Sequence, residues 1–178
     1  MIKFSYLCPR NKSNYGLGHS SYNINCIMKF HIEIVVDISF AKLIELFENP
    51  NNLKKWQPNV ISFKHLSGEI GQPGATSEIH YDIIVKKIKI KETIVKRNLP
   101  QEFVLKHETD GVTNTIYNNF KEIAPNKTRW IMENNFQFGG IMKFAALALK
   151  GAFKKQTELT MERFKKFAET ISEEELNA

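Results

Sequence analysis

The sequence of 178 residues predicts one α+β domain, in which an antiparallel sheet of seven strands is accompanied by two short helices and a long C-terminal helix. Three observations predict this class. Seven segments have the apolar and polar spacing of strands. The connections among the last six segments are too short for crossovers, which makes those strands antiparallel. The stretch 140–171 instead repeats its apolar residues at the helical period.

The first strand and the two short helices come at the start of the domain. Apolar residues alternate with polar ones over 29–38, which predicts a half-buried strand. Ser39 is a suitable cap for a helix over 40–48, and Asn49-Pro50 ends that helix. A second short helix is predicted over 51–56. The alternating apolar residues of the first strand are Phe30, Ile32, Ile34 and Val36.

Six further strands follow, separated by turn residues. The sequence Asp110-Gly111 between two apolar-bearing segments is a strong hairpin signal. The breakers in 68–74 predict a turn, and Gly139-Gly140 ends the sheet before the long helix begins. The six strands are predicted at 60–66, 76–83, 88–96, 102–109, 113–123 and 127–138.

The predicted C-terminal helix has one apolar side. Gln156 and Thr160, one turn apart, fall within this apolar stripe. Because a buried amide or hydroxyl needs a partner, they contact either a ligand head group, or a strand side chain or a trapped water. Small residues in the first half of the helix leave room above the sheet. The stripe consists of Met142, Ala145, Ala146, Leu149, Ala152, Phe153, Phe164, Phe167 and Ile171.

Composition excludes several classes of protein. Residues 28–178 carry 22 basic and 19 acidic groups, too balanced a charge to predict a nucleic-acid partner. No stretch approaches the roughly 20 apolar residues of a membrane span, so we expect no stable membrane insertion. Both cysteines, Cys8 and Cys26, precede Met28, and the absence of cysteine afterwards fits either a reducing compartment or simple indifference to thiols; we expect a cytoplasmic location. The sequence does not predict an oligomeric state.

Residues 1–27 differ from the rest of the chain. The segment 11–25 is rich in Asn, Ser, Gly and Tyr and has no sustained period. We therefore expect 1–27 to be a disordered or non-native N-terminal extension, 28–171 to be the domain and 172–178 to be a C-terminal tail. Met28 directly precedes the first strand, so it is one possible natural start; a genuine flexible arm is the alternative.

The order and spacing of these elements resemble the START-like helix-grip superfamily (SRPBCC), which includes pollen-allergen-type ligand carriers, polyketide cyclase-like proteins and CoxG-like proteins. The likeness covers about residues 28–170. It implies a curved sheet wrapped around the C-terminal helix, with an elongated apolar cavity between them that binds a hydrophobic small molecule, lipid or polyketide-like. It implies no cofactor and no shared catalytic set. The segments that carry it are 28–37, 39–46, 49–56, 68–75, 98–100 and the terminal helix.

Eleven residues are predicted to bind the ligand. Alternation places four of them on the inner face of the sheet, whereas either face remained open for Tyr117. Each has a structural alternative: a core histidine with a partner, a core aromatic residue, or, for Trp56, a hydrophobic plug. Asn134, Gln156, Thr160 and His107 are expected to form a small polar cluster. The eleven are Trp56, Tyr81, His107, Tyr117, Trp130, Met132, Asn134, Leu149, Phe153, Gln156 and Thr160.

No catalytic or metal-binding residues are predicted. The chain has no nucleophile elbow and no phosphate-binding loop after a strand, and its histidines lack the spacing of a zinc site. Three functions stay open. The first is non-catalytic binding of a hydrophobic small molecule. The second is a cyclase/dehydratase-type enzyme in which His107, Asn134 or Tyr117 polarises a polyketide-like substrate. The third is a protein-interaction domain of the co-chaperone kind.

Overall fold

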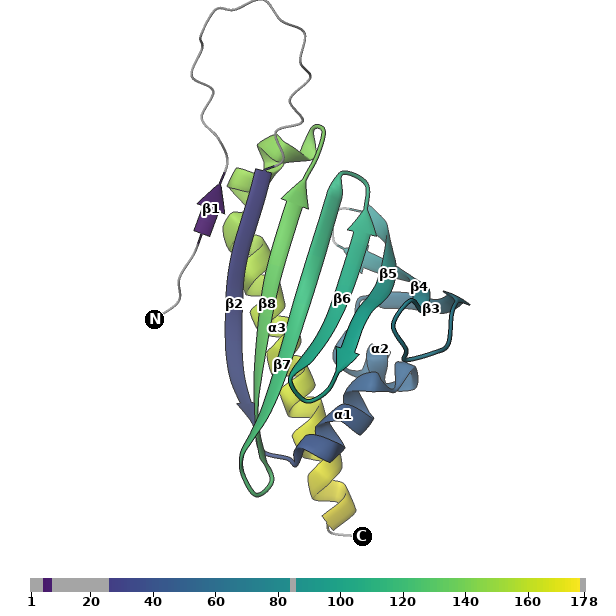
Figure 1. The fold of residues 1–178 in the computed structure, drawn as a ribbon, viewed down its shortest axis with the longest axis vertical. Coiled ribbons are helices and arrows are strands. Elements are labelled where there is room, and N and C mark those ends of the chain that lie inside the picture. The colour runs from purple at the N-terminus through teal and green to yellow at the C-terminus, as the bar shows by residue number, and fades with distance from the viewer. Residues whose placement is uncertain (1–4, 8–25, 84–85, 177–178) are drawn as a thin grey trace, which may run out of the picture.

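The computed structural model describes residues 5–7, 26–83 and 86–176 and shows a curved antiparallel sheet with one long helix across its inner face (Figure 1). The strand order is β1-β2-β8-β7-β6-β5-β4-β3. The strands are β1 (Ser5–Leu7), β2 (Cys26–Val36), β3 (Val60–Ser67), β4 (Thr76–Ile83), β5 (Lys86–Asn98), β6 (Glu102–Thr109), β7 (Val112–Ala124) and β8 (Lys127–Phe138), and the helices are α1 (Phe40–Glu48), η1 (Pro50–Asn52), α2 (Leu53–Trp56) and α3 (Met142–Leu176).

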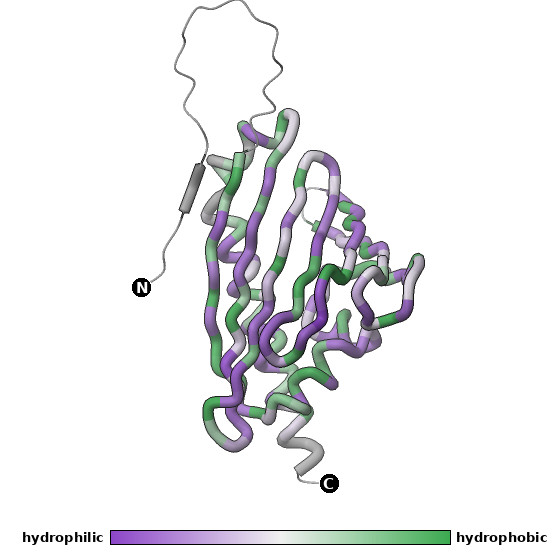
Figure 2. Tube along the Cα trace, viewed as in Figure 1, coloured by the Kyte–Doolittle hydropathy of each residue, from purple (hydrophilic) through white to green (hydrophobic). Residues whose placement is uncertain are grey.

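The seven predicted strands are confirmed as β2 to β8, and the two short helices lie where they were expected. The bounds of α1, β4, β6 and β8 are those predicted from the sequence. The Ser39 side chain caps α1 by accepting a hydrogen bond from the backbone N–H of Lys42 at 3.3 Å. Apolar and polar residues alternate along much of β2 to β8, which Figure 2 displays along the trace.

The structure adds to the prediction near both ends of the chain, and β3, β5 and β7 differ from it by one or two residues at their ends. β2 begins at Cys26, because Cys26 and Ile27 continue its pairing with the last residues of β8. Ser5–Leu7 pair with β2 and add a short eighth strand at the edge of the sheet. The helix α3 continues to Leu176, through most of the predicted tail. Residues 1–4 and 8–25 of the predicted extension lie outside the described residues, so its nature stays a prediction.

The helix α3 lies over one side of the sheet rather than over its centre. Among the strands, most of its contacts are with β2, and α2 packs against it from the other side. In Figure 1, α3 runs behind β2, β8 and β7, while β3 and β4 lie at a steep angle to β2 at the far side of the sheet. The inner face of the strands β3 to β6 is therefore left at a distance from the helix.

An aromatic core fills one end of the space between sheet and helix. The fully buried Trp130 lies with its ring centre 5.4 Å from those of both Phe47 and Phe164. Trp56 closes on the same group, 5.2 Å from Phe164. These rings bind α1, α2, the sheet and the C-terminal half of α3 into one body. Further along the helix, Phe153 of α3 packs on β8, with its ring centre 4.8 Å from that of Phe136 and 5.6 Å from that of Phe138.

Candidate functional site

A pocket of about 610 Å³ lies between the inner face of the sheet, the short helices and the middle of α3. Ile88 and Ile90 of β5 face it, and they are only half-buried although they lie on the inner face. The helix contributes Phe153, Thr157 and Thr160. A concave site of this size with a mainly apolar wall suits a small hydrophobic molecule. The apolar lining residues of the sheet are Phe63, Ile79, Ile83, Ile88, Ile90, Ile94, Phe103, Leu105, Ile116, Met132 and Phe136.

A row of polar side chains crosses this apolar floor. Glu92 of β5 is the cross-strand partner of His107 of β6, and His107 is the partner of Asn114 of β7. The Nε2 atom of His107 lies 2.7 Å from Oε2 of Glu92, with both side chains about four-fifths buried. Asn114 donates from Nδ2 to Oδ1 of Asn134 at 2.8 Å. The sheet register thus brings two hydrogen-bonded pairs side by side.

Three polar atoms of the lining residues are buried without a hydrogen-bond partner in the described part of the chain. They are Oδ1 of Asn114, Nδ2 of Asn134 and Nε1 of Trp56. Asn118, two residues along β7, is different. It donates to the carbonyl of Phe103 at 3.2 Å and accepts from Nε1 of Trp130 at 2.9 Å. Asn118 therefore has a complete structural role, whereas the Asn114–Asn134 pair has spare hydrogen-bonding capacity.

Tyr81 of β4 is a neutral hydrogen-bond donor at the α2 side of the pocket. Its hydroxyl donates to Oε1 of Gln57 at 2.8 Å. Burial of the phenol, together with the negative charge of Glu92, raises the pKa of Tyr81 well above its usual range. This hydroxyl therefore keeps its proton well above the pH at which an exposed tyrosine ionises.

Comparison of structures finds solved proteins with the same architecture, whereas comparison of sequences finds no match. No protein-family model and no curated protein sequence matches the chain. The Zhui aromatase/cyclase from Streptomyces sp. R1128 superposes with a TM-score of 0.69 at 10% identity, covering 80% of this chain and 94% of that one. Ara h 8.0201 gives 0.61 at 12% identity (80% and 97%). Major latex-like protein 151 from Panax ginseng gives 0.59 at 13% identity (80% and 97%).

The chain has the START-like helix-grip fold. At this low identity the likeness concerns the fold, and the predicted site residues are judged by the structure itself. Those that line the helix-grip pocket are Trp56, Tyr81, His107, Met132, Asn134, Phe153, Gln156 and Thr160.

Three predicted site residues lie elsewhere. Tyr117 points to the outer face of β7, where its side chain is 37% exposed, because Ile116 and Asn118 take the inner positions. Trp130 belongs to the aromatic core and does not reach the pocket. Leu149 is 40% exposed on α3. The buried face of the helix passes through Met161, Phe164 and Ala168, which corrects the predicted orientation by roughly one residue step around the axis.

The predicted polar cluster does not form. Asn134, His107, Gln156 and Thr160 all line the pocket, but His107 contacts Glu92 and Asn134 accepts from Asn114, and Gln156 is exposed and not buried against the sheet. Gln156 and Thr160 bond along the helix itself: the Thr160 hydroxyl donates to the carbonyl of Gln156 at 2.9 Å. The partners that sequence reasoning missed are Glu92 and Asn114. Glu92 has the same inner-facing parity as Ile88 and Ile90 on β5 and could have been a candidate from the sequence, whereas its pairing with His107 and the place of Asn114 follow from strand order.

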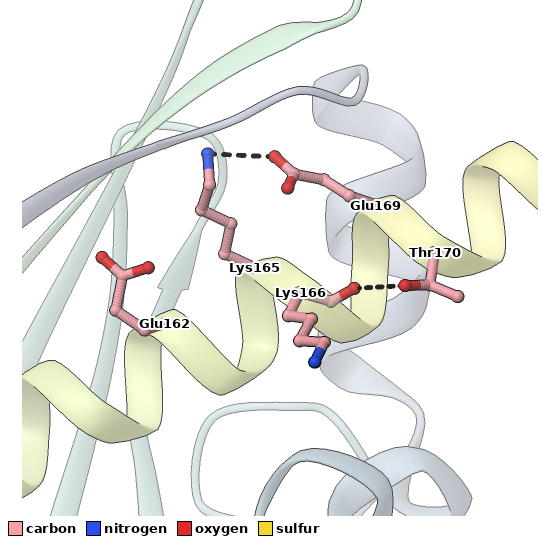
Figure 3. Close-up of a pocket in the computed structure, with 5 residues that line it drawn as sticks. All are labelled: Glu162, Lys165, Lys166, Glu169 and Thr170. Carbon is pink, nitrogen blue, oxygen red and sulfur yellow. Dashed lines mark hydrogen bonds and ion pairs between the residues drawn. The ribbon is translucent and has the colours of Figure 1, made fainter.

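A second, shallow pocket on the outer side of α3 has a structural explanation. It is lined by Glu162, Lys165, Lys166, Glu169 and Thr170 (Figure 3). Lys165 contacts Glu169 at 3.0 Å and donates to the carbonyl of Val35, while Glu169 accepts from the backbone N–H of Asp37 at 2.7 Å. These charged residues hold the helix to the end of β2, so we assign them a structural role and not a role in ligand binding.

The described residues provide neither a metal-binding cluster nor a membrane-spanning helix. Within 5–7, 26–83 and 86–176, no group of three or more His, Cys, Asp or Glu side chains is placed to hold a metal ion. In the same ranges, no helix has the length and apolar character needed to cross a bilayer. The expected cytoplasmic location stays a prediction.

Proposed function

We propose that this protein binds a hydrophobic small molecule, without transforming it, in the pocket between the sheet and α3. The observation that carries the proposal is the pocket itself, about 610 Å³ of space walled mainly by isoleucine, leucine and phenylalanine side chains. Close packing normally fills such a space with side chains, so one left open on the inner face of a sheet calls for an occupant. A fold neighbour that is named an aromatase/cyclase supports a small organic ligand for this architecture.

A fluorescent probe tests the proposal. N-phenyl-1-naphthylamine is neutral and emits strongly only when it leaves water for an apolar site. The wild-type protein should bind it saturably. Ile90→Trp fills the pocket from the floor and should weaken binding at least about tenfold. Val95→Trp is the matched control, because Val95 is on β5 but is 50% exposed and outside the pocket lining. Equal binding by both variants would contradict the proposal.

The contact between His107 and Glu92 favours a second candidate, an enzyme that moves a proton beside a carbonyl group. A carboxylate held at 2.7 Å orients an imidazole for general acid–base work, and this pair faces the pocket. Deuterium exchange at the carbon beside the carbonyl of α-tetralone, followed by NMR in D₂O, tests it. Faster exchange with wild-type protein than with His107→Ala would support the enzyme. Exchange at the rate of buffer alone would leave the non-catalytic binder.

A further inference from the structure

The polar row on the pocket floor is built by strand register and not by chance proximity. Consecutive cross-strand pairs place Glu92, His107 and Asn114 on three neighbouring strands, and Asn114 bonds onward to Asn134 on the fourth. Around them the floor is apolar, with Ile90 and Ile116 among its members. A polar row enclosed in this way can form hydrogen bonds with one polar group of a bound molecule, while the apolar residues around it provide most of the contact area.

The two asparagines in this row are incompletely satisfied. Asn114 is 7% exposed and Asn134 is 2% exposed. Their mutual bond uses one donor and one acceptor, and it leaves Oδ1 of Asn114 and Nδ2 of Asn134 buried without partners among the described residues. If both side-chain amides are flipped, exchanging their O and N atoms, the pair still has one donor and one acceptor without a partner. Buried polar groups are nearly always paired, so this remainder indicates a bound group that supplies both.

We infer that the Asn114–Asn134 pair binds a hydroxyl group, and that the ligand is a neutral hydrophobic alcohol or phenol. The inference rests on the proposed function and adds the chemical class of the ligand. A hydroxyl donates one hydrogen bond to Oδ1 of Asn114 and accepts one from Nδ2 of Asn134. It is the smallest organic group that does both, and it leaves the rest of the ligand against the apolar floor.

Other groups satisfy the pair less well. A ketone or an ether accepts from Asn134 but gives nothing to Asn114. An ammonium group donates but cannot accept. A carboxylate would face the carbonyl oxygen of Asn114 and lie two strands from Glu92, where like charges repel. Arg163, which also lines the pocket, belongs to α3 and not to the floor row. A site built to pair with a hydroxyl discriminates strongly against analogues that lack one.

Four matched probes test the inference: 2-naphthol, 2-methoxynaphthalene, naphthalene and 2-naphthoate. They share one ring system and differ in the group offered to the asparagines. Their dissociation constants are measured at pH 7 by displacement of N-phenyl-1-naphthylamine and by calorimetry. The wild-type protein should bind 2-naphthol at least about tenfold more tightly than each of the other three.

The double variant Asn114→Leu/Asn134→Leu replaces the pair by apolar groups of similar shape. It should bind naphthalene within about twofold of wild type and lose the preference for 2-naphthol, which falls below about threefold. Thr115→Val is the control on the outer face of β7 and should keep the full preference. Circular dichroism and thermal unfolding verify that each variant is folded, and Asn134→Leu alone replaces the double variant should that one not fold.

The outcomes separate the two claims. If naphthalene binds but 2-naphthol binds no more tightly, the hydroxyl inference fails, an ordered water completes the pair, and the proposed function stands. If the preference survives in the double variant, the assignment to Asn114 and Asn134 fails. If no probe binds to the wild-type protein, the proposed function fails and the inference fails with it.

Discussion

His107 lies directly opposite Glu92 across the β5–β6 pair, with its Nε2 atom 2.7 Å from the carboxylate. The two side chains are 20% and 18% exposed, so the contact is sheltered without being cut off from the pocket. It determines which nitrogen of the imidazole is engaged and keeps a carboxylate on an otherwise apolar floor. The pocket is therefore an apolar site with one defined polar row.

Removal of the carboxylate should cost stability. We expect Glu92→Ala to lower the free energy of unfolding by about 1–3 kcal/mol, the usual loss for a sheltered hydrogen bond to a charged group. Urea unfolding measures it, and a double-mutant cycle with His107→Ala isolates the pair. Glu108→Ala is the control. Its exposed contact with Lys106 should contribute less than about 1 kcal/mol. A coupling energy near zero for Glu92 and His107 would contradict this account of the row.

The hydroxyl of Tyr81 should resist ionisation in the folded protein. Because burial, with the charge of Glu92, raises its pKa, the folded state keeps this proton at a pH where the unfolded state loses it. The resulting stability is present below the unfolded pKa of about 10 and is lost as the pH rises above it. Thermal unfolding between pH 9 and pH 11 should therefore decline less steeply in Tyr81→Phe than in wild type. Equal slopes would show that Tyr81 titrates freely.

The fold was predictable from the sequence because the strands show alternating apolar residues and are separated by recognisable turn residues. Alternation in β8 places Asn134 and Met132 on the inner face, and Asp110-Gly111 sets the β6–β7 hairpin, as the structure confirms. These signals are local. Because side chains alternate between the two faces of a sheet, each strand has only two ways to place its residues toward the core.

The orientation of α3 was not predictable in the same way. Its buried face includes Met161, which is followed in sequence by the charged Glu162 and Arg163, whereas Leu149 is partly exposed. The helix is apolar over more than one side, so only its contacts with β2 and α2 select the buried one. The partners of His107 and Asn134 come from other strands and follow from strand order, which the alternation pattern does not contain.

Asn118 and the Asn114–Asn134 pair should respond differently to leucine. Asn118→Leu leaves the indole N–H of the fully buried Trp130 without its acceptor and should cost about 1–3 kcal/mol. The double replacement of Asn114 and Asn134 removes both partners together and also removes two unpaired atoms, so it should be close to neutral. Guanidinium unfolding compares them. A larger loss in the double variant would mean that the pair serves the fold and not a ligand.

Gly111 has two requirements that alanine cannot meet. Its φ is +71°, and an added Cβ would lie 3.1 Å from Cγ of Met142 and 3.3 Å from the carbonyl oxygen of Gly139. Gly71 has a φ of +78° with open space around it, so it provides the matched control. Each Gly→Ala change should cost about 1–2 kcal/mol for the left-handed backbone. Gly111→Ala should lose more than Gly71→Ala in thermal unfolding, and the reverse order would argue against the close packing of the β6–β7 turn on the start of α3.

A hydrophobic molecule in the pocket above β5 would be detected by native mass spectrometry of freshly purified protein. We predict that wild-type protein and Val95→Trp carry the same additional small-molecule mass, or take up the same molecules from a hydrophobic extract, and that Ile90→Trp does neither. Identical spectra for wild type and Ile90→Trp, whether both carry the extra mass or both lack it after exposure to the extract, would contradict the account.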